Sequence, residues 1–135
     1  RAATIGAFAE ESGAQAVVLN APTPIETLIN VNRVVDVPTI YTIVRHMDDL
    51  NARIDAGVAA FNIAGGKETA NLVAEVRAAI DSKHPNFPII ASGGKTDEQI
   101  TATIEAGANA VTFAAYGVTE ATFHAKMEAY RKQKS

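Results

Sequence analysis

Apolar residues along the chain fall into short runs, each introduced by a glycine or a proline. Three runs begin alike, with a glycine followed by small and apolar residues, at positions 13–19, 57–63 and 107–113. A glycine at this point is typical of the end of a helix that precedes a strand. Two further runs, at 37–41 and 87–91, are introduced by proline. The pattern therefore predicts five short strands.

The segments between these strands carry the signals of helices. Thr23-Pro24-Ile25-Glu26 has a hydroxyl residue at the N-cap, a proline at the first helical position and a glutamate three residues after the cap. Thr96-Asp97-Glu98-Gln99 is a second capping box of this kind. We expect helices at about 2–12, 24–35, 47–56, 67–82 and 119–132, and one more that starts after Thr96.

Strands that alternate with helices at this spacing predict an α/β fold with parallel (βα) units. Several strands alternate large apolar residues with a small or polar one, as where Phe61 and Ile63 flank Asn62. One face of such a strand packs on helices while the other looks into a narrow lumen, as in a closed barrel. We therefore predict a partial TIM barrel of five strands, corresponding to strands 4 to 8. The alternative is a five-stranded flavodoxin-like doubly wound sheet.

The size of the chain, 135 residues, fits a single (βα)5 domain spanning 1–135. The first predicted helix follows directly on Arg1, with no strand before it. We therefore expect the chain to be the C-terminal portion of a larger barrel. A half-open sheet of this kind predicts either a homo-oligomer or association with the missing N-terminal half of the barrel.

Composition narrows the classes of function. Hydrophobic residues make up 47% and charged residues 20%, which excludes a disordered chain. The net charge of −3 argues against nucleic-acid binding, and no apolar stretch has the length of a membrane span. The chain contains no cysteine, which excludes disulfides and thiolate metal sites. We expect a soluble, cytoplasmic protein.

The segment IIASGGKTDEQITATIEAGANAVTF, residues 89–113, is similar to the seventh and eighth strands of phosphate-binding TIM barrels. That family includes isomerases, aldolases and synthases. The chain also resembles bacterial barrel proteins that carry only a general hydrolase label. It departs from the family pattern at Lys95, where an apolar residue is usual, and at 114–117, where the family has a Gly-Ser or similar small pair. The resemblance implies a barrel fold and an anion site near the seventh strand.

Two glycine-lysine turns offer candidate anion sites. A nucleotide P-loop needs a glycine five residues before the last one, but Ile89 and Phe61 stand at those places. The alternative is a barrel phosphate site in which backbone N–H groups and the N-terminus of the next helix hold the anion. The simplest alternative is a turn without a ligand. The residues of the two turns, with the serine that ends the seventh strand, are Gly65, Gly66, Lys67, Ser92, Gly93, Gly94 and Lys95.

Other polar residues stand where strands end, which is the end at which barrel enzymes hold their chemistry. His46 is a candidate general acid or base, and Arg45 a candidate clamp for a carboxylate or phosphate. A helix cap and a surface salt bridge are their structural alternatives. Asn20 and Asn62 are candidates to orient a substrate, and Tyr116 to line the pocket mouth. Lys67 has a further alternative, a Schiff-base role.

The three histidines are far apart in the sequence and show no metal-binding spacing, so we predict neither a metal site nor a cofactor. Together these features predict a lyase, isomerase or aldolase type of barrel enzyme that acts on a small anionic, phosphorylated metabolite. The alternative function is a non-catalytic anion-binding or structural barrel fragment that self-associates.

Overall fold

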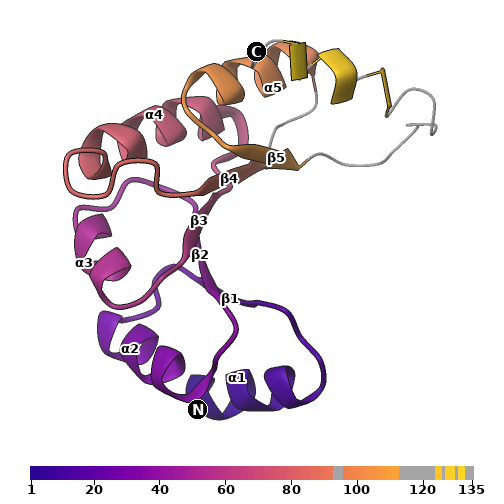
Figure 1. The fold of residues 1–135 in the computed structure, drawn as a ribbon. Helices are drawn as coiled ribbons and strands as arrows, with labels where there is room; N and C mark the ends of the chain where they lie inside the picture. Colours follow the sequence, from indigo (N-terminus) through magenta and orange to yellow (C-terminus); the bar gives the residue numbers. More distant parts are fainter. Residues whose placement is uncertain (93–95, 113–123, 126, 130, 133–135) are drawn as a thin grey trace.

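The computed structural model describes residues 1–92, 96–112, 124–125, 127–129 and 131–132. Its elements follow one another as predicted (Figure 1), and residues 124–132 are helical wherever they are described. The elements are α1 (Ala2–Glu11), β1 (Val17–Asn20), α2 (Ile25–Val34), β2 (Thr39–Ile43), α3 (Leu50–Asp55), β3 (Ala60–Ile63), the 3-10 turn η1 (Gly66–Glu68), α4 (Thr69–Ile80), β4 (Ile89–Ser92), α5 (Asp97–Glu105) and β5 (Ala110–Thr112).

The five strands form one parallel sheet in the order β1-β2-β3-β4-β5. The helices lie along one face of this sheet, and the whole molecule curves into an arc with the strands on its inner side (Figure 1). A flavodoxin-like sheet has the order 2-1-3-4-5 and helices on both faces. The flavodoxin-like alternative is therefore wrong, and the arrangement is the sequential one of a βα barrel.

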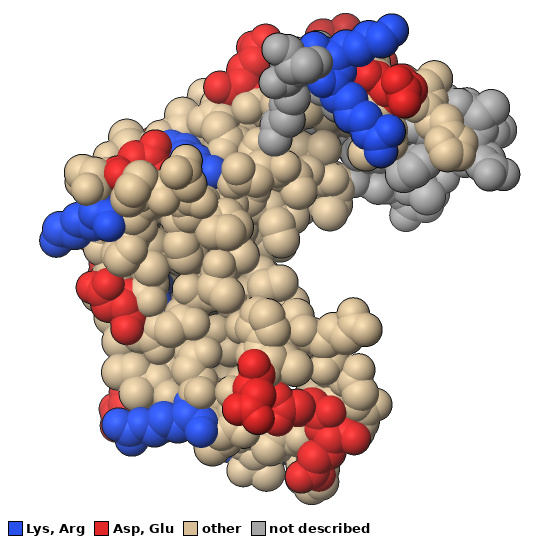
Figure 2. Space-filling model, viewed as in Figure 1, with Lys and Arg blue, Asp and Glu red and all other residues tan. Residues whose placement is uncertain are grey.

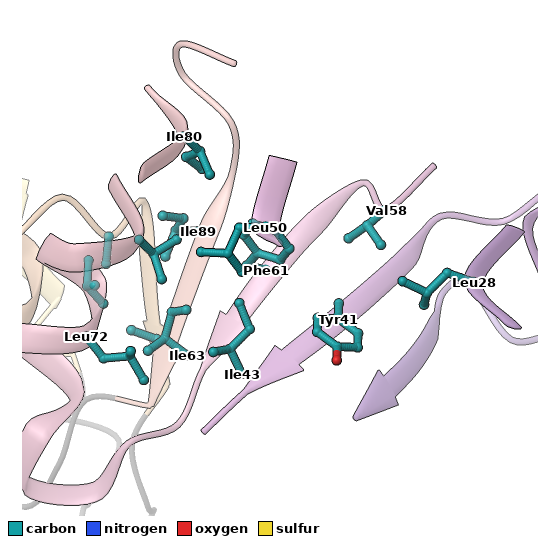
Figure 3. Packing of buried hydrophobic residues seen from close by; sticks show 14 residues of the cluster. Leu28, Tyr41, Ile43, Leu50, Val58, Phe61, Ile63, Leu72, Ile80 and Ile89 are labelled. Atoms are coloured by element: carbon teal, nitrogen blue, oxygen red, sulfur yellow. The ribbon is translucent and has the colours of Figure 1, made fainter. Parts of the chain in front are cut away.

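The core lies between the convex face of the sheet and the helices. Tyr41, Phe61, Ile63 and Ile89 point from the strands into this layer and are fully buried (Figure 3). Asn62, between two of them, points to the concave face and is half-buried. Because successive side chains of a strand point to opposite faces, the alternation seen in the sequence correctly separated the helix-facing from the inner positions.

The glycines predicted to end helices have positive φ angles, at Gly13, Gly57 and Gly107. A Cβ atom on Gly57 would lie 2.8 Å from the amide nitrogen of Asn32, and one on Gly107 would lie 2.9 Å from Cγ of Arg77. In both cases a polar side chain from the helix one βα unit earlier, α2 or α4, lies against the turn. Gly13 has nothing within 4 Å of the same position.

The observed starts of the helices agree less closely with those predicted from the sequence. The capping box at Thr96 is confirmed, with both reciprocal hydrogen bonds present. The predicted cap at Thr23 is wrong, because Pro24 is the N-cap of α2 and the Thr23 hydroxyl donates instead to the carbonyl of Asn20. Helix α3 begins at Leu50 rather than near 47, because the preceding residues form the loop that carries Met47 over the Tyr41 hydroxyl. Within the described residues, no helix is both long enough and apolar enough to cross a membrane.

Candidate functional site

A row of polar side chains crosses the concave face of the sheet. Asn20 of β1 pairs in register with Thr42 of β2, and Thr42 pairs with Asn62 of β3. The Asn62 amide donates to the Thr42 hydroxyl over 3.3 Å. Beyond Asn62 the row continues with the apolar residues Ile90 and Ala110. This row is thus polar on the first three described strands and apolar on the last two.

A second polar pair lies nearer the carboxyl ends of the strands. Ser92 of β4 is in register with Thr112 of β5, two residues beyond Ile90 and Ala110, so both point to the concave face. Ser92 is half-buried and Thr112 is exposed. Sequence analysis selected Asn20, Asn62 and Ser92 but missed both threonines. Thr42 could have been found by aligning the predicted strands, because it occupies the same position in β2 as Asn62 does in β3.

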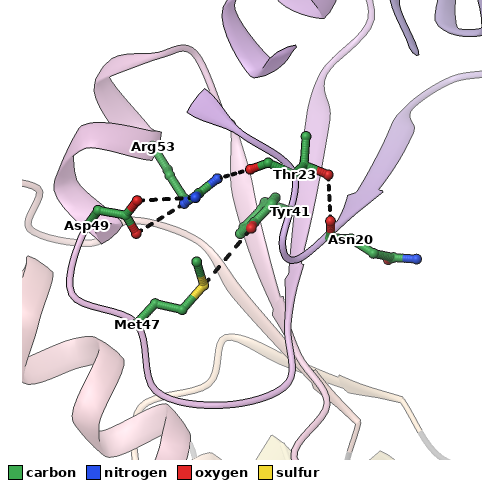
Figure 4. Close-up of polar contacts among 6 residues, drawn as sticks. All are labelled: Asn20, Thr23, Tyr41, Met47, Asp49 and Arg53. Carbon is green, nitrogen blue, oxygen red and sulfur yellow. Dashed lines mark hydrogen bonds and ion pairs between the residues drawn. The ribbon is translucent and has the colours of Figure 1, made fainter. Parts of the chain in front are cut away.

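The turn that follows Asn20 is held in place by hydrogen bonds, one of which comes from a side chain of the helix layer (Figure 4). Thr23 donates its backbone N–H to the carbonyl of Asn20 over 3.0 Å, and its hydroxyl donates to the same oxygen. The Thr23 carbonyl in turn accepts a hydrogen bond from Arg53 of α3. The guanidinium of Arg53 therefore fixes the turn that follows Asn20.

Arg53 is almost completely buried, with 7% of its side chain exposed. Its Nε and Nη2 atoms donate to the two carboxylate oxygens of Asp49 over 3.2 and 3.1 Å. Its guanidinium carbon lies 4.7 Å from the ring centroid of Tyr41. Burial raises the pKa of the Tyr41 phenol, Arg53 lowers it and Asp49 raises it further. Since Tyr41 faces the helices, this cluster supports the site from behind and does not line it.

The predicted catalytic pair, Arg45 and His46, follows the end of β2 in an exposed loop. His46 has one ring nitrogen 2.9 Å from Asp48 and the other 3.5 Å from Glu75 of α4. Because α4 belongs to the outer helix layer, the imidazole is directed toward that layer in this structure. The structure thus does not bring His46 into the row of Asn20, Thr42 and Asn62.

The turn after β3 is closed by its own hydrogen bonds. The N–H of Gly65 donates to the Thr69 hydroxyl over 3.0 Å, and that hydroxyl donates to the carbonyl of Gly66 over 2.8 Å. Gly66 has a φ of 62°, which a side chain would strain, and Lys67 is exposed. A pocket of about 210 Å³ lies between this turn and α5, and Lys67, Glu98 and Gln99 contribute to its wall. Gly93, Gly94, Lys95 and Tyr116 lie outside the described residues.

Histidines and acidic residues form no group that would hold a metal ion in the part of the chain that the structure describes. His84 lies 3.2 Å from Asp55 and packs edge-on against the ring of Phe87. These contacts join the loop after α4 to α3, which is a structural role.

No protein-family model matches the chain, and no curated protein matches its sequence. Solved structures do match. A mandelate oxidase variant bearing an FMN adduct is 18% identical, with a TM-score of 0.67 over 93% of this chain and 50% of that protein. A presumed phosphonomutase from Burkholderia cenocepacia is 18% identical, with a TM-score of 0.64 over 82% of this chain and 65% of that protein.

These likenesses define the fold class. Both proteins are TIM-barrel enzymes, and the chain spans about half to two thirds of their length. The five parallel strands with their helices therefore form part of a TIM barrel. The predicted barrel resemblance is confirmed at this level, while the hydrolase label receives no support from the comparisons. At this level of identity the likeness concerns the fold alone.

Proposed function

We propose that this chain supplies the substrate-binding part of a TIM-barrel enzyme of the lyase, isomerase or aldolase type, acting on a small anionic, phosphorylated metabolite. The observation that carries the proposal is the polar row of Asn20, Thr42 and Asn62 on the concave face at the carboxyl ends of parallel strands. This is the end of a barrel at which substrates bind. The row offers amide donors and hydroxyl groups, which suit the oxygen atoms of a phosphate or carboxylate.

The proposal assigns the residues distinct roles. Asn20 and Asn62 orient the substrate through their amide groups, with Thr42 holding the Asn62 amide in place. Ser92 and the following Gly93, Gly94 and Lys95 hold the anionic group at the N-terminal end of α5, which carries the positive end of the helix dipole. The proposal also assigns the Gly65, Gly66 and Lys67 turn, and Tyr116, to binding of the same substrate. We also propose that residues 1–135 form one (βα)5 unit of a larger barrel.

Arg45 and His46 remain the proposed catalytic pair. Both lie in the loop just after β2, and in this proposal the loop moves so that His46 turns from Glu75 toward the strand ends. Proton transfer requires a group within hydrogen-bond reach of the substrate, and the geometry of a free enzyme often tightens on binding. The His46→Gln variant should therefore bind the anion as tightly as the unmodified chain, because in this proposal His46 transfers protons and does not hold the anion.

A second candidate function is favoured by one observation. The concave residues of the described strands are amides, hydroxyls and apolar groups, with no carboxylate among them. Side-chain amides and aliphatic hydroxyls can hydrogen-bond an anion, but they do not serve as general acids or bases at neutral pH as an imidazole or a carboxylate does. The second candidate is therefore an anion-binding barrel part without turnover of its own.

The test measures the melting temperature of the 135-residue chain with and without inorganic phosphate or 2-phosphoglycolate. Ligand that binds only the folded state raises stability by about 2.7 kcal/mol at a hundredfold excess over Kd, a shift of several degrees. Asn62→Ala should remove most of the shift. Asn71→Ala is the matched control, because Asn71 lies exposed on α4 and contacts Glu68. No shift with either anion, or equal loss in both variants, would refute the anion site.

A further inference from the structure

The chain contains an internal repeat, which residues 37–62 and 87–112 form. The two segments align without a gap at an offset of 50 residues. The identical residues are Pro38 and Pro88, Ile40 and Ile90, Ala52 and Ala102, Ile54 and Ile104, Ala56 and Ala106, Gly57 and Gly107, and Ala60 and Ala110. The elements follow the same offset, with β2, α3 and β3 in the first copy and β4, α5 and β5 in the second. The structure thus contains one strand-helix-strand unit twice.

The two copies also pair their strands in the same register. Each has an isoleucine facing an alanine, at 40 and 60 in the first copy and at 90 and 110 in the second. Two residues nearer the carboxyl ends, each has a pair of polar residues. We call Thr42 with Asn62 the first polar pair, and Ser92 with Thr112 the second polar pair. Both pairs lie on the concave face, because side chains two residues apart in a strand point to the same side.

The repeat explains why the polar row on the concave face ends at Asn62. The next residue in register is Ile90, which belongs to the isoleucine-alanine pair of the second copy. Ser92 lies two residues beyond Ile90 on the same strand. The second polar pair is therefore displaced from the first by two strands across the sheet and by two residues toward the carboxyl ends.

The distance between the two polar pairs is short. Their nearest members are Asn62 and Ser92, which lie on neighbouring strands and two residues apart along them. A strand spacing of about 4.8 Å and a rise of about 3.3 Å per residue place their Cα atoms about 8 Å apart. Both side chains lie on the inner side of the arc, where neighbouring side chains converge (Figure 1). A ligand with a chain of a few carbon atoms is therefore long enough to contact both pairs.

The surroundings of the two pairs favour an anion. Figure 2 shows that the inner border of the arc beside the sheet consists of uncharged residues, whereas the charged side chains lie on its outer side and at its ends. The sequence also repeats a cation, since Arg45 comes three residues after Thr42 and Lys95 three residues after Ser92. Each copy thus combines a polar pair on the sheet with a positive charge in the sequence that follows its first strand.

We propose that the two polar pairs are equivalent half-sites for one ligand, a small acyclic molecule with an anionic group at each end. One anionic group accepts hydrogen bonds from the first polar pair and the other from the second, and the carbon chain between them lies over Ile90. The inference rests on the proposed function, because it uses the same concave face, and it adds that the substrate carries two anionic groups. Joining two weakly bound groups in one molecule raises the affinity above that of either group alone.

The test measures, by isothermal titration calorimetry, the Kd of the 135-residue chain for methylene, ethylene, trimethylene and tetramethylene bisphosphonate. With carbon–carbon bonds of about 1.5 Å, the two longest compounds hold their phosphonate groups about 5–7 Å apart. That separation leaves room for a hydrogen bond from a polar pair at each end. These two compounds should bind at least about tenfold more tightly than methylene bisphosphonate. Methylene bisphosphonate is the matched control, because it also carries two phosphonate groups but is too short to contact both pairs.

Two variants test the pairs one at a time. Thr42→Val and Ser92→Ala each remove the hydroxyl of one pair, so each should abolish the preference for the longer compounds. Ser82→Ala is the control variant, because Ser82 is exposed in the turn after α4, and it should keep the preference. Circular dichroism shows whether the variants are folded, and the comparison of ligand lengths on the unmodified chain needs no variant.

Methylphosphonate, which has a single anionic group, separates this inference from the proposed function. If methylphosphonate binds and the four bisphosphonates bind with equal affinity, the two half-sites are refuted and the anion site stands. A length preference that survives both Thr42→Val and Ser92→Ala would also overturn the half-sites. If neither methylphosphonate nor any bisphosphonate binds, the anion site is refuted and this inference with it.

Discussion

Arg53 links the helix layer to the turn behind Asn20, so replacing it tests whether the site is held from outside the sheet. Arg53→Met keeps the length of the side chain and removes its charge. The charge-assisted hydrogen bond to the Thr23 carbonyl is worth about 1.5–3 kcal/mol. The contact with the Tyr41 ring adds about 1 kcal/mol. The Asp49 carboxylate is 42% exposed, so water screens that pair and its loss adds no more than about 1 kcal/mol. Together these contributions give an expected loss of about 2.5–5 kcal/mol.

The assay is urea unfolding followed by circular dichroism, with Arg33→Met as the control. Arg33 is exposed in the last turn of α2, and its replacement should change the free energy of unfolding by less than about 0.5 kcal/mol. Hydrogen exchange at Thr23 should also accelerate in Arg53→Met, because the turn loses its support. Equal destabilisation by the two variants, or an unchanged rate at Thr23, would refute the reasoning.

Three further predictions concern the turns, a titration and a helix cap. Gly57→Ala should lower the free energy of unfolding, measured in urea, by about 1 kcal/mol or more beyond the loss caused by Gly13→Ala. Both substitutions strain a positive φ, but only Gly57 has the Asn32 side chain against it. Equal losses in the two variants would contradict this. Burial raises the pKa of Tyr41 above its ordinary value of 10.0, so the unfolded chain ionises first and stability should fall as the pH rises above 10.0. Tyr41→Phe should weaken this fall, and an identical pH profile would count against it. Thr96→Ala should cost about 1 kcal/mol through loss of the capping box, whereas Thr23→Ala should leave the start of α2 intact, as measured by urea unfolding.

The strands and their faces could be predicted because each follows a strong local signal. Gly13, Gly57 and Gly107 mark helix ends, since only glycine readily takes the positive φ found at each. The change from apolar to polar at Asn62 marks the concave face. The order of the strands in the sheet could be established only from the three-dimensional structure. The sequential order that excluded the flavodoxin-like sheet depends on which strands lie side by side, and local patterns do not report that.

The site was predictable only in part, for a physical reason that differs between residues. Asn20 and Asn62 stood out because a polar group interrupts or ends an apolar run. Thr42 did not, since threonine is common in strands for its β-branched shape and gives no sign of facing a lumen. Arg53 was missed because a single arginine in a short helix resembles a surface residue. Its burial arises from Thr23 and Tyr41, which lie far from it in the sequence.

Helix starts show a similar limit. Thr23-Pro24-Ile25-Glu26 has the residues of a capping box, yet Thr23 turns back to Asn20 because the turn between β1 and α2 is fixed by Arg53. Tertiary contacts therefore override a local preference that is worth about 1 kcal/mol. At Thr96 the same kind of box forms as predicted.

The central claim is that the polar row on the concave face binds a small anion, and titration of the isotope-labelled chain with 2-phosphoglycolate tests it most directly. Nuclear magnetic resonance reports the backbone amide shifts of Asn20, Thr42, Asn62 and Ser92 one by one, together with the side-chain amide shifts of the two asparagines. The account predicts saturable shifts at these residues, and in particular at the side-chain amide of Asn62, with little change at Asn71 on the outer surface of α4. Shifts confined to the outer helices, or no saturable shift on the concave face, would contradict it.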